Sequence, residues 1–303
     1  MRLLIITQKV DKNDPVLGFM HRWLEEFNKN FEKVTIICLE KGEHNLPNKI
    51  FPLGKRKLKA LFNFYKYIWQ ERNNYDAVFV HMNQEYVLLA GDIWWLLGKK
   101  VYLWRNHAKG NMLTDLAVFL SDKVFCTSPS SYTAKFKKTV LMPVGIDTDF
   151  FKPDPNISRA PNSVLFLGRI SPVKKVLEFI DWAETEGSRI VTIAGPILDK
   201  EYGEKVKLKI AVRGSEEPSG SRGENSKLKI NFIGPVTNEE TLKLYQSHEI
   251  YANFTPAGSF DKTIIEAAAC GCKLEVRNPA AKNLNVEDHS LQLLMKKIKM
   301  EIS

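Results

Sequence analysis

The sequence predicts an α/β protein with two Rossmann-like domains, each built on a parallel sheet. Short apolar runs alternate with helical patterns along both halves of the chain, as they do in βαβ units. The alternation stops and restarts around a proline-rich stretch between residues 143 and 161. The length of 303 residues also suits two domains. We therefore expect domains over residues 1–145 and 146–303, facing across a cleft that binds a ligand.

The first half begins with the apolar run Leu3–Ile6, which predicts the first strand. Phe19, Trp23 and Phe27 follow at helical spacing. The remaining strands are expected over Val34–Leu39, Ala77–Val80, Val101–Trp104 and Val124–Cys126, and the remaining helices over 58–69, 85–97 and 111–120.

The second half repeats this alternation after the proline-rich stretch. Its strands are expected over Val164–Leu167, Ile190–Ala194, 229–233, Ile250–Phe254 and 272–276, and its helices over 173–186, 201–212, 238–247, 262–270 and 286–300. The segment Gly214–Ser226 is rich in Gly, Ser and Glu, which predicts a mobile surface loop.

The composition excludes several classes of protein. With 44% apolar and 26% charged residues, the chain is neither disordered nor fibrous. The longest apolar stretch, Tyr86–Leu97, is interrupted by Asp92 and is too short to span a bilayer. No signal-peptide core follows the first strand. The 4 cysteines show no zinc spacing, so we expect reduced thiols in a cytoplasmic protein.

The positive charge is concentrated in the first half. Residues 1–150 contain 22 Lys and Arg against 15 Asp and Glu, whereas residues 151–303 contain 22 against 20. The densest basic cluster lies on the helix predicted around residues 56–72, at Lys55, Arg56, Lys57, Lys59, Lys66 and Arg72. Two interpretations stay open: the apolar side of this helix packs in the core, or it docks on an anionic membrane surface at the inner face of the membrane.

Familiar nucleotide and metal motifs are absent. There is no P-loop, no G-x-G-x-x-G after the first strand and no H-E-x-x-H. Asp147-Thr148-Asp149 has the D-x-D spacing that can hold a divalent metal, but it directly follows a Pro-Val-Gly turn. We expect a hinge or capping role for it, and no metal site.

The second half contains residues suited to binding phosphate. Gly168 and Arg169 end a predicted strand, and Lys174 follows at the start of a helix. Two cations at the carboxyl end of a strand suit a diphosphate. Downstream, a Gly-Ser loop leads into a helix that Gly271 ends, so free amides at the helix N-terminus would face an anion. Glu266, one turn inside that helix, could accept hydrogen bonds from ribose.

These segments resemble the donor domain of glycosyltransferase family 4. The resemblance rests on Gly168-Arg169 with Lys174, on residues 231–236 with Glu239, Leu242 and Tyr245, and on residues 258–271. The segment Pro143-Val144-Gly145-Ile146-Asp147, with Phe150-Phe151, is similar to the family's interdomain segment. In the first half, Gly18 and His107 fit the family pattern after the first and fourth predicted strands.

The resemblance implies the GT-B fold and a retaining, metal-independent transfer of a hexose from a nucleotide-diphosphate sugar. The first domain would bind a saccharide or lipid-linked acceptor, and no cofactor other than the donor substrate is implied. The implied catalytic residues are His107, Arg169 and Lys174. The implied donor-binding residues are Gly18, Gly168, Gly258, Ser259, Phe260, Asp261, Lys262, Thr263 and Glu266.

The chain departs from the family pattern at two places in this region. Gly258 stands where the first of two glutamates is usual, and Lys175 stands where a glycine is usual. The Gly-Gly segment that the family has after its last strand is also missing, and residues 275–279 lead quickly to a short terminal helix, which is typical of a divergent or C-terminally shortened member. Gly258 and this short tail motivate an alternative, a non-catalytic protein of the same fold that binds a nucleotide sugar or another phospho-ligand. A third interpretation is a basic protein that binds a membrane or nucleic acid. The chain lacks the interleaved aromatic and basic residues of an RNA-binding module, so we expect no nucleic-acid partner.

Overall fold

A computed structural model of the chain describes residues 1–188, 190–215, 228–256, 261–281 and 284–302. The chain divides into two compact units. The first unit comprises Met1–Gly145 together with Asp288–Ser303, and the second comprises Ile146–Glu287. Each unit is a parallel sheet covered by helices, which confirms the predicted fold class.

The sheet of the first unit has seven parallel strands in the order β3-β2-β1-β4-β5-β6-β7. The chain adds strands outward from β1 on one side and then from β4 on the other, so the direction of winding reverses between these two. Their bounds are β1 Arg2–Val10, β2 Lys33–Lys41, β3 Ile50–Pro52, β4 Ala77–His81, β5 Lys100–Trp104, β6 Lys123–Cys126 and β7 Thr139–Leu141. The two short edge strands, β3 and β7, were not predicted.

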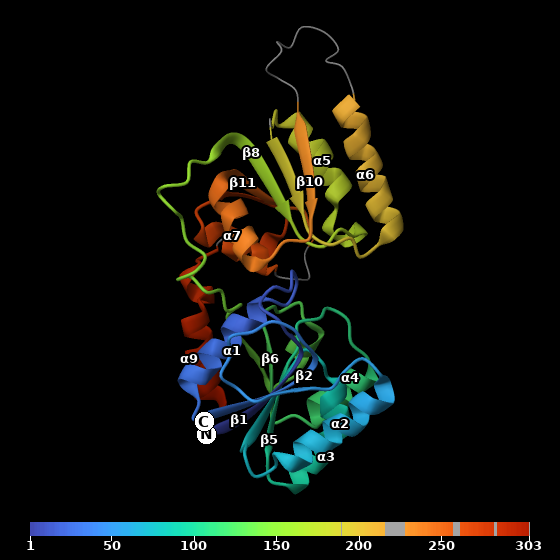
Figure 1. Ribbon diagram of the computed structural model, residues 1–303, viewed down its shortest axis with the longest axis vertical. Helices are drawn as coiled ribbons and strands as arrows, with labels where there is room; N and C mark the ends of the chain where they lie inside the picture. Colours follow the sequence, from blue (N-terminus) through green and yellow to red (C-terminus); the bar gives the residue numbers. More distant parts are fainter. Residues whose placement is uncertain (189, 216–227, 257–260, 282–283, 303) are drawn as a thin grey trace. The chain divides into compact units, whose positions relative to one another are not determined.

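Helices cover both faces of this sheet (Figure 1). Successive side chains of a strand point to opposite faces, so Leu3 and Ile5 pack in one apolar core and Leu4 and Ile6 in the other. The first core is closed by α1 (Phe19–Asn30) and α9 (Leu291–Ile302), and the second by α2 (Lys57–Gln70), α3 (Glu85–Leu96) and α4 (Met112–Phe119). Burial on both faces explains why these strands read as continuous apolar runs. The loop from β6 to β7 contains a short 3-10 helix, η1 (Tyr132–Lys135).

The C-terminal helix α9 belongs to the first unit, although the sequence analysis assigned it to the second domain. Its buried stripe, Leu291, Leu294, Met295, Ile298 and Ile302, lies in the core beside α1. The Tyr102 hydroxyl donates to the carbonyl of Ile302 at 3.2 Å, and Lys123 Nζ lies 2.8 Å from Glu301 Oε2. The stripe was visible in the sequence, but an apolar stripe does not say which sheet it will cover.

Close packing around Gly145 joins three distant parts of the first unit. The indole N–H of Trp23 donates to the Gly145 carbonyl at 2.9 Å. Gly145 has a φ of +75°, and a Cβ there would stand 2.3 Å from Leu294 Cδ2. Only glycine fits this position, because a side chain would strain the backbone and displace α9.

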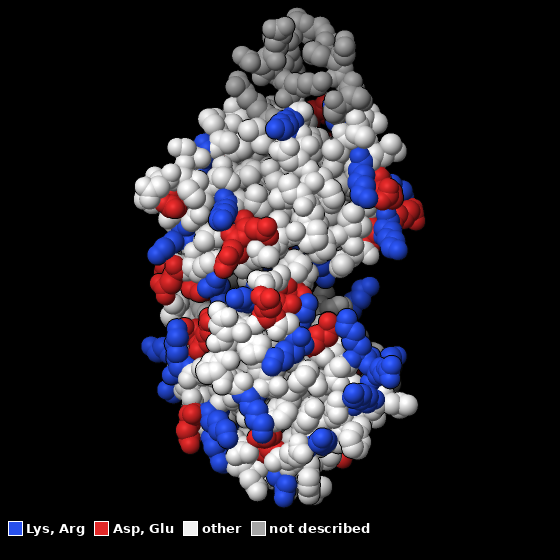
Figure 2. Space-filling model, in the orientation of Figure 1, with Lys and Arg blue, Asp and Glu red and all other residues white. Residues whose placement is uncertain are grey.

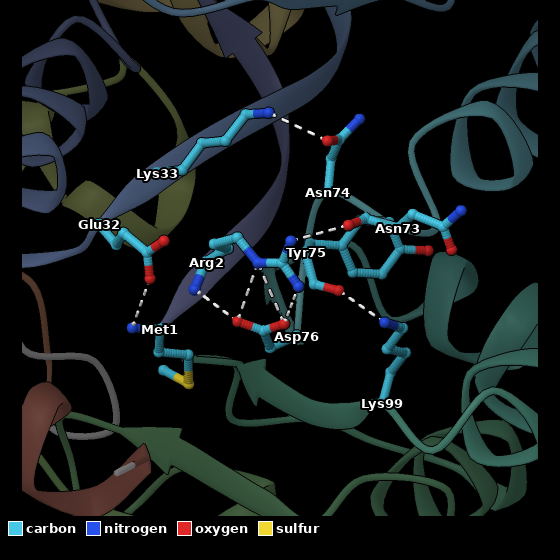
Figure 3. A network of polar contacts seen from close by, with 9 residues as sticks. All are labelled: Met1, Arg2, Glu32, Lys33, Asn73, Asn74, Tyr75, Asp76 and Lys99. Carbon is cyan, nitrogen blue, oxygen red and sulfur yellow. Dashed lines mark hydrogen bonds and ion pairs between the residues drawn. The ribbon is translucent and has the colours of Figure 1, made fainter.

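At the amino ends of β1 and β4, Arg2 and Asp76 join the two strands (Figure 3). The Arg2 backbone N–H donates to Asp76 Oδ2 at 2.8 Å, and its Nη2 lies 2.5 Å from Oδ1. Nη1 of Arg2 donates to the Asn73 carbonyl at 2.8 Å, and Lys99 Nζ donates to the Tyr75 carbonyl at 2.7 Å. These hydrogen bonds from Arg2 lower the pKa of Asp76 to about 2.

The sheet of the second unit has five parallel strands in the order β10-β9-β8-β11-β12. The strands are β8 Ala160–Leu167, β9 Ile190–Ala194, β10 Lys229–Gly234, β11 His248–Asn253 and β12 Lys273–Val276. The helices are α5 Val176–Thr185, α6 Lys200–Ser215, α7 Asn238–Ser247 and α8 Lys262–Ala269, with the 3-10 turns η2 Pro172–Lys174, η3 Pro279–Ala281 and η4 Glu287–His289.

Several element boundaries in the second unit differ from the predicted ones; β8, for example, begins at Ala160 and not at Val164. The helix expected over 173–186 is split into η2 and α5, because Lys175 between them has a φ of +53°. Helix α6 continues to Ser215, so the first two residues of the predicted loop 214–226 are helical, and the rest of that loop lies outside the described residues.

Candidate functional site

The order of strands in the second unit reverses between β8 and β11. Open parallel sheets bind ligands beyond the carboxyl ends of their strands at such a reversal, because the two following loops diverge there. The segment after β8 carries Gly168, Arg169 and Lys174. The segment after β11 carries Thr255 and leads to Asp261, which directly precedes α8. The predicted phosphate-binding residues thus follow the two strands that flank the reversal.

Lys174 and Asp261 form a buried ion pair at this place. Lys174 Nζ lies 2.5 Å from Asp261 Oδ2 and 3.1 Å from the hydroxyl oxygen of Thr255. The same carboxylate oxygen accepts from the Thr255 hydroxyl at 2.8 Å and from Asn253 Nδ2 at 3.0 Å. Lys174 is 8% exposed. The ammonium group of Lys174, which follows β8, is therefore held in one position by two residues of the segment after β11.

This environment keeps Asp261 ionised. Burial alone would raise the pKa of Asp261, but the Lys174 charge and the hydrogen bonds from Lys174, Asn253 and Thr255 outweigh burial and lower it. Asp261 is the N-cap residue of α8, yet its side chain makes no capping hydrogen bond in the described structure. The carboxylate is directed to Lys174 instead, so the sequence prediction of a donor-binding Asp261 missed its role as the partner of Lys174.

Arg169 differs from Lys174 in its surroundings. Its side chain is exposed, and it makes no hydrogen bond or ion pair with the residues that the structure describes. A guanidinium group in this state is available to bind phosphate with little competition from the protein.

A close approach of backbone segments, missed by the sequence analysis, shapes this edge of the sheet. The N–H of Gly168 donates to the Ala194 carbonyl at 3.0 Å, and the N–H of Gly195 donates to the Gly234 carbonyl at 2.7 Å. Gly195 has a φ of +139°, and a Cβ there would stand 1.9 Å from the Gly168 oxygen. Gly195 therefore has to be glycine. In the sequence, the one sign of this role is that Gly195 directly follows the predicted strand Ile190–Ala194.

The first turn of α8 is tied to the neighbouring β11 and α7. The Tyr251 hydroxyl donates to Thr263 Oγ1 at 2.7 Å. The Tyr245 hydroxyl lies 3.2 Å from both the Thr263 carbonyl and Glu266 Oε2. Gly271, after the helix, has a φ of +78°, which confirms its predicted role at the C-terminus.

Glu266 is 6% exposed and is therefore not an ordinary surface glutamate. Burial raises its pKa, and the nearby Lys262 ammonium and the Tyr245 hydrogen bond offset this only in part. Burial likewise lowers the pKa of Lys262, and the Glu266 charge opposes that shift. A buried carboxylate beside a lysine one helical turn away is a polar group suited to receiving hydroxyl donors from a ligand.

Three predicted donor-binding residues, Gly258, Ser259 and Phe260, lie outside the described residues. A further cation follows β12 at the same edge of the sheet. The Arg277 guanidinium lies 4.1 Å from the centre of the Phe254 ring, and the Arg277 N–H donates to the Asn253 carbonyl. Arg277 was not predicted, because no basic pattern surrounds it in the sequence.

His107 and Gly18, the two predicted residues of the first half, belong to the first unit. His107 follows β5, is exposed, and its Nδ1 lies 3.0 Å from the backbone of Lys109. Gly18 is buried and directly precedes α1, and its N–H donates to the Asp14 carbonyl at 3.0 Å. His81, which also follows a strand, is buried with its ring against Phe19 and Trp23.

Arg105, just before His107, was also missed by the sequence analysis. It is 9% exposed, and its Nη2 donates to the Lys109 carbonyl at 2.9 Å. Its Nη1 is buried without a hydrogen-bond partner among the described residues. Burial lowers the pKa of Arg105, and the Glu85 charge opposes the shift. The carboxyl end of the first sheet thus contains a buried cation whose hydrogen bonds are not all satisfied by the described part of the chain.

The D-x-D motif forms a turn. The Asp147 carboxylate accepts hydrogen bonds from the backbone N–H groups of Asp149 and Phe150, both at 3.2 Å. In the described parts of the chain, no group of three or more His, Cys, Asp or Glu side chains is placed to hold a metal ion. The hydrogen bonds of Asp147 to the backbone of its own turn are those of the expected capping role.

Neither a family model nor a curated protein sequence matches the chain. Solved structures do match it. Alr3699/HepE from Anabaena, in complex with UDP, is 16% identical, with a TM-score of 0.68 over 99% of this chain and 89% of that one. The catalytic domain of starch synthase IV from Arabidopsis thaliana, bound to ADP and acarbose, is 9% identical, with a TM-score of 0.67 over 100% and 92%. Sucrose-phosphate synthase from Thermosynechococcus elongatus is 14% identical, with a TM-score of 0.62 over 100% and 94%.

The chain has the GT-B fold. The likeness extends over both units, because each of these alignments covers nearly the whole chain. In the GT-B fold of this chain, the reversal between β8 and β11 lies in the second unit, with Arg169 and Lys174 beside it. None of the described helices is both long and apolar enough to cross a bilayer.

Proposed function

We propose that this protein is a glycosyltransferase that moves a hexose from a nucleotide-diphosphate donor to an acceptor, as a member of glycosyltransferase family 4. One observation carries the proposal: Arg169, Lys174 and the N-terminus of α8 converge on the strand reversal of the second unit. The fold likeness to HepE in complex with UDP and to starch synthase IV bound to ADP supports a nucleotide donor.

The charges suit the chemistry of the leaving group. When the bond between sugar and diphosphate breaks, negative charge accumulates on the phosphate oxygens, and fixed cations stabilise it in the transition state. Arg169 supplies a guanidinium group that the described residues leave unpaired. Lys174 supplies an ammonium group that Asp261 and Thr255 hold in place. The backbone amides at the start of α8 add partial positive charge.

Glu266 is proposed to receive the hydroxyl groups of the ribose. Its carboxylate is buried in α8 and is already oriented by Tyr245. When a ligand lacks the hydroxyl, the buried carboxylate oxygen loses a hydrogen-bond donor that water cannot replace. Such a contact therefore discriminates strongly between ligands. We propose that the two cations take the place of a metal ion on the diphosphate, so that transfer is metal-independent. Retention of configuration at the sugar carbon is proposed from the family resemblance.

The first unit is proposed to bind the acceptor, a saccharide or a lipid-linked molecule. Its carboxyl edge carries the exposed His107 and the buried Arg105, which are suited to polar recognition. We propose that His107 lies near the reacting sugar and that Gly18 binds the donor by letting it approach the backbone before α1. The enzyme would act in the cytoplasm, at the inner face of the membrane.

A panel of nucleotide sugars tests this function. We expect one donor to raise the melting temperature and to be hydrolysed slowly to the free nucleoside diphosphate when no acceptor is present. The alternative, a non-catalytic binder of nucleotide sugars, is favoured by Gly258 at the position of the usual glutamate. It predicts thermal stabilisation without any hydrolysis or transfer. Stabilisation by no nucleotide or nucleotide sugar would contradict both.

A further inference from the structure

The outer surfaces of α2, α3 and α4 carry an unusual number of large apolar side chains. Leu58 and Met112 are each 85% exposed, and Trp95 is 76% exposed. We call the full set the three-helix face; its exposed apolar members are Leu58, Leu61, Phe62, Trp69, Trp95, Leu96, Met112, Leu113, Leu116 and Phe119. Single exposed apolar residues are ordinary, but a set on neighbouring helices marks an interaction surface.

Helices α2, α3 and α4 form one layer on the same face of the first unit's sheet (Figure 1). The Tyr65 hydroxyl of α2 donates to the Leu89 carbonyl of α3 at 2.9 Å. Helices α3 and α4 meet so closely that a Cβ on Gly91 would stand 3.0 Å from Leu120 Cβ. The exposed side chains of the three helices therefore belong to one continuous layer of the first unit.

These residues are not required by the core. The inward sides of the helices already close it, with Phe64 and Ile68 from α2, Trp94 from α3 and Val118 from α4. Leu61 and Trp69 lie on the apolar side of the helix predicted around residues 56–72, for which core packing was one interpretation. Both are exposed, so the apolar side of α2 only partly packs in the core.

Cations border the apolar residues. Figure 2 shows Lys and Arg side chains gathered over and beside α2. Arg56, Lys57 and Lys59 are exposed and form no ion pair with the residues that the structure describes. The Arg72 guanidinium lies 4.6 Å from the centre of the Trp69 ring and thus keeps a cation beside an exposed indole. Helix α2 itself contains no acidic residue.

We propose that the three-helix face docks the first unit on an anionic phospholipid bilayer. The α2 cations would contact phosphate headgroups, while the apolar side chains of α3 and α4 enter the interfacial region. Tryptophan suits this region because its indole is apolar with one polar N–H. Lysine stems can lie along apolar surface while their charges stay with the headgroups. The proposal goes beyond glycosyl transfer and does not depend on it.

A bilayer fits this surface better than a second copy of the chain. A symmetric dimer brings the same patch of both copies together, so the counter-charges for the α2 cations would have to come from the few carboxylates of α3 and α4, because α2 contains none. An anionic lipid surface offers opposite charge over its whole area, and each Lys or Arg gains on the order of a fivefold increase in binding.

Cosedimentation with vesicles at low and high salt tests the proposal. Wild-type protein is expected to bind phosphatidylcholine vesicles containing phosphatidylglycerol and to bind pure phosphatidylcholine weakly. The variant Arg56→Gln/Lys57→Gln/Lys59→Gln should lose binding to the anionic vesicles by roughly a hundredfold. A matched control removes three exposed lysines from the second unit, Lys200, Lys229 and Lys243, and should bind like wild type.

The apolar contribution is tested by Leu113→Ser/Phe119→Ser, both on α4. We expect binding to fall by roughly tenfold or more, with an unchanged melting temperature because both side chains are exposed. Leu208→Ser on α6, equally exposed to water, is the control. Lipids brominated in their acyl chains should quench the fluorescence of the wild type more than that of Trp95→Phe.

Three outcomes would overturn the proposal. The first is an absence of wild-type binding to anionic vesicles at low salt. The second is vesicle binding that the α2 and α4 variants leave unchanged. The third is a concentration-dependent dimer that the same variants dissociate, with no vesicle binding, which would assign the face to a second copy. The vesicle assays contain no nucleotide sugar, so their failure leaves the proposed glycosyl transfer untouched.

Discussion

Lys174 Nζ lies 2.5 Å from Asp261 Oδ2, although 87 residues separate them in the sequence. The pair joins the loop after β8 to the residue that begins α8. Both residues are buried or nearly so, and the hydrogen bonds of Asn253 and Thr255 converge on the same carboxylate oxygen. A cation held in this way is preorganised for a ligand, but its charge is partly neutralised until a stronger anion arrives.

Substitution of either member of this pair should destabilise the free protein, but the two variants should respond in opposite ways to nucleoside diphosphate. Lys174→Met should destabilise the fold by about 3–5 kcal/mol, because it leaves a buried carboxylate without its counter-charge. It should also abolish the stabilisation by nucleoside diphosphate. Asp261→Asn should destabilise the free protein as well, but nucleoside diphosphate should then restore its melting temperature, because the ligand supplies the missing negative charge. Thermal shift titrations with nucleoside diphosphate measure the response of both variants. A smaller rise in melting temperature for Asp261→Asn than for wild type would contradict this role.

Arg169→Ala should weaken nucleoside diphosphate binding by roughly 1.5–3 kcal/mol, the range for a hydrogen bond to a charged group. The melting temperature of the free protein should not change, since Arg169 is exposed and pairs with no described residue. Calorimetric titration measures the affinity, with Arg213→Ala on α6 as a control. Unchanged affinity would remove Arg169 from the site.

Gly195→Ala should destabilise the second unit by about 3 kcal/mol, since the new methyl group would overlap the Gly168 carbonyl. Binding of nucleoside diphosphate should fall with it, because Gly168 has to move away. Gly187→Ala is the matched control: Gly187 also has a positive φ of +70°, but nothing lies within 4 Å of the added Cβ. Denaturant unfolding measures the free energy of unfolding of the two variants. Equal losses of stability would show that only backbone strain matters and that the overlap with Gly168 does not.

Chelation should leave activity intact. Asp147 accepts backbone hydrogen bonds from its own turn, and the described residues contain no cluster suited to a metal ion. Transfer or donor hydrolysis measured with and without EDTA should therefore be equal. Activity lost to EDTA and restored by manganese or magnesium would return Asp147 and Asp149 to the site.

The Arg2–Asp76 pair should contribute to acid sensitivity. The pKa of Asp76 is lowered to about 2 in the folded protein by hydrogen bonds from Arg2, whereas an unfolded aspartate titrates near 3.9. The stabilisation is thus present above pH ~4 and lost as the pH falls towards about 2. Because the Asp76 side chain is 41% exposed, we expect at most about 1 kcal/mol.

Denaturant unfolding between these pH values measures that loss. Arg2→Met should unfold more easily at neutral pH and should lose less stability than wild type on acidification. An identical pH dependence of the two proteins would contradict the assignment.

Local patterns in the sequence were sufficient for most elements of both sheets. Apolar runs such as Val101–Trp104 and Ile190–Ala194 predicted strands that the structure confirms within one residue. Helix 238–247 was predicted with its observed bounds, and the structure shows that a capping box of Thr237 and Glu240 begins it. The edge strands β3 and β7 were missed, because three residues each carry too little pattern.

The sequence by itself determined the fold class, the approximate positions of most strands and the chemical types of the residues at the candidate site, because these depend on periodicity and on neighbours in the chain. Only the tertiary structure decided which distant groups meet. It paired Lys174 with Asp261, brought Gly195 against Gly168, assigned α9 to the first unit and left the outer residues of α2, α3 and α4 exposed. An amphipathic stripe or a charged side chain in the sequence indicates only that a packing or charge partner is needed. Which partner it meets depends on how the strands are ordered in the sheet, and local sequence does not encode that order.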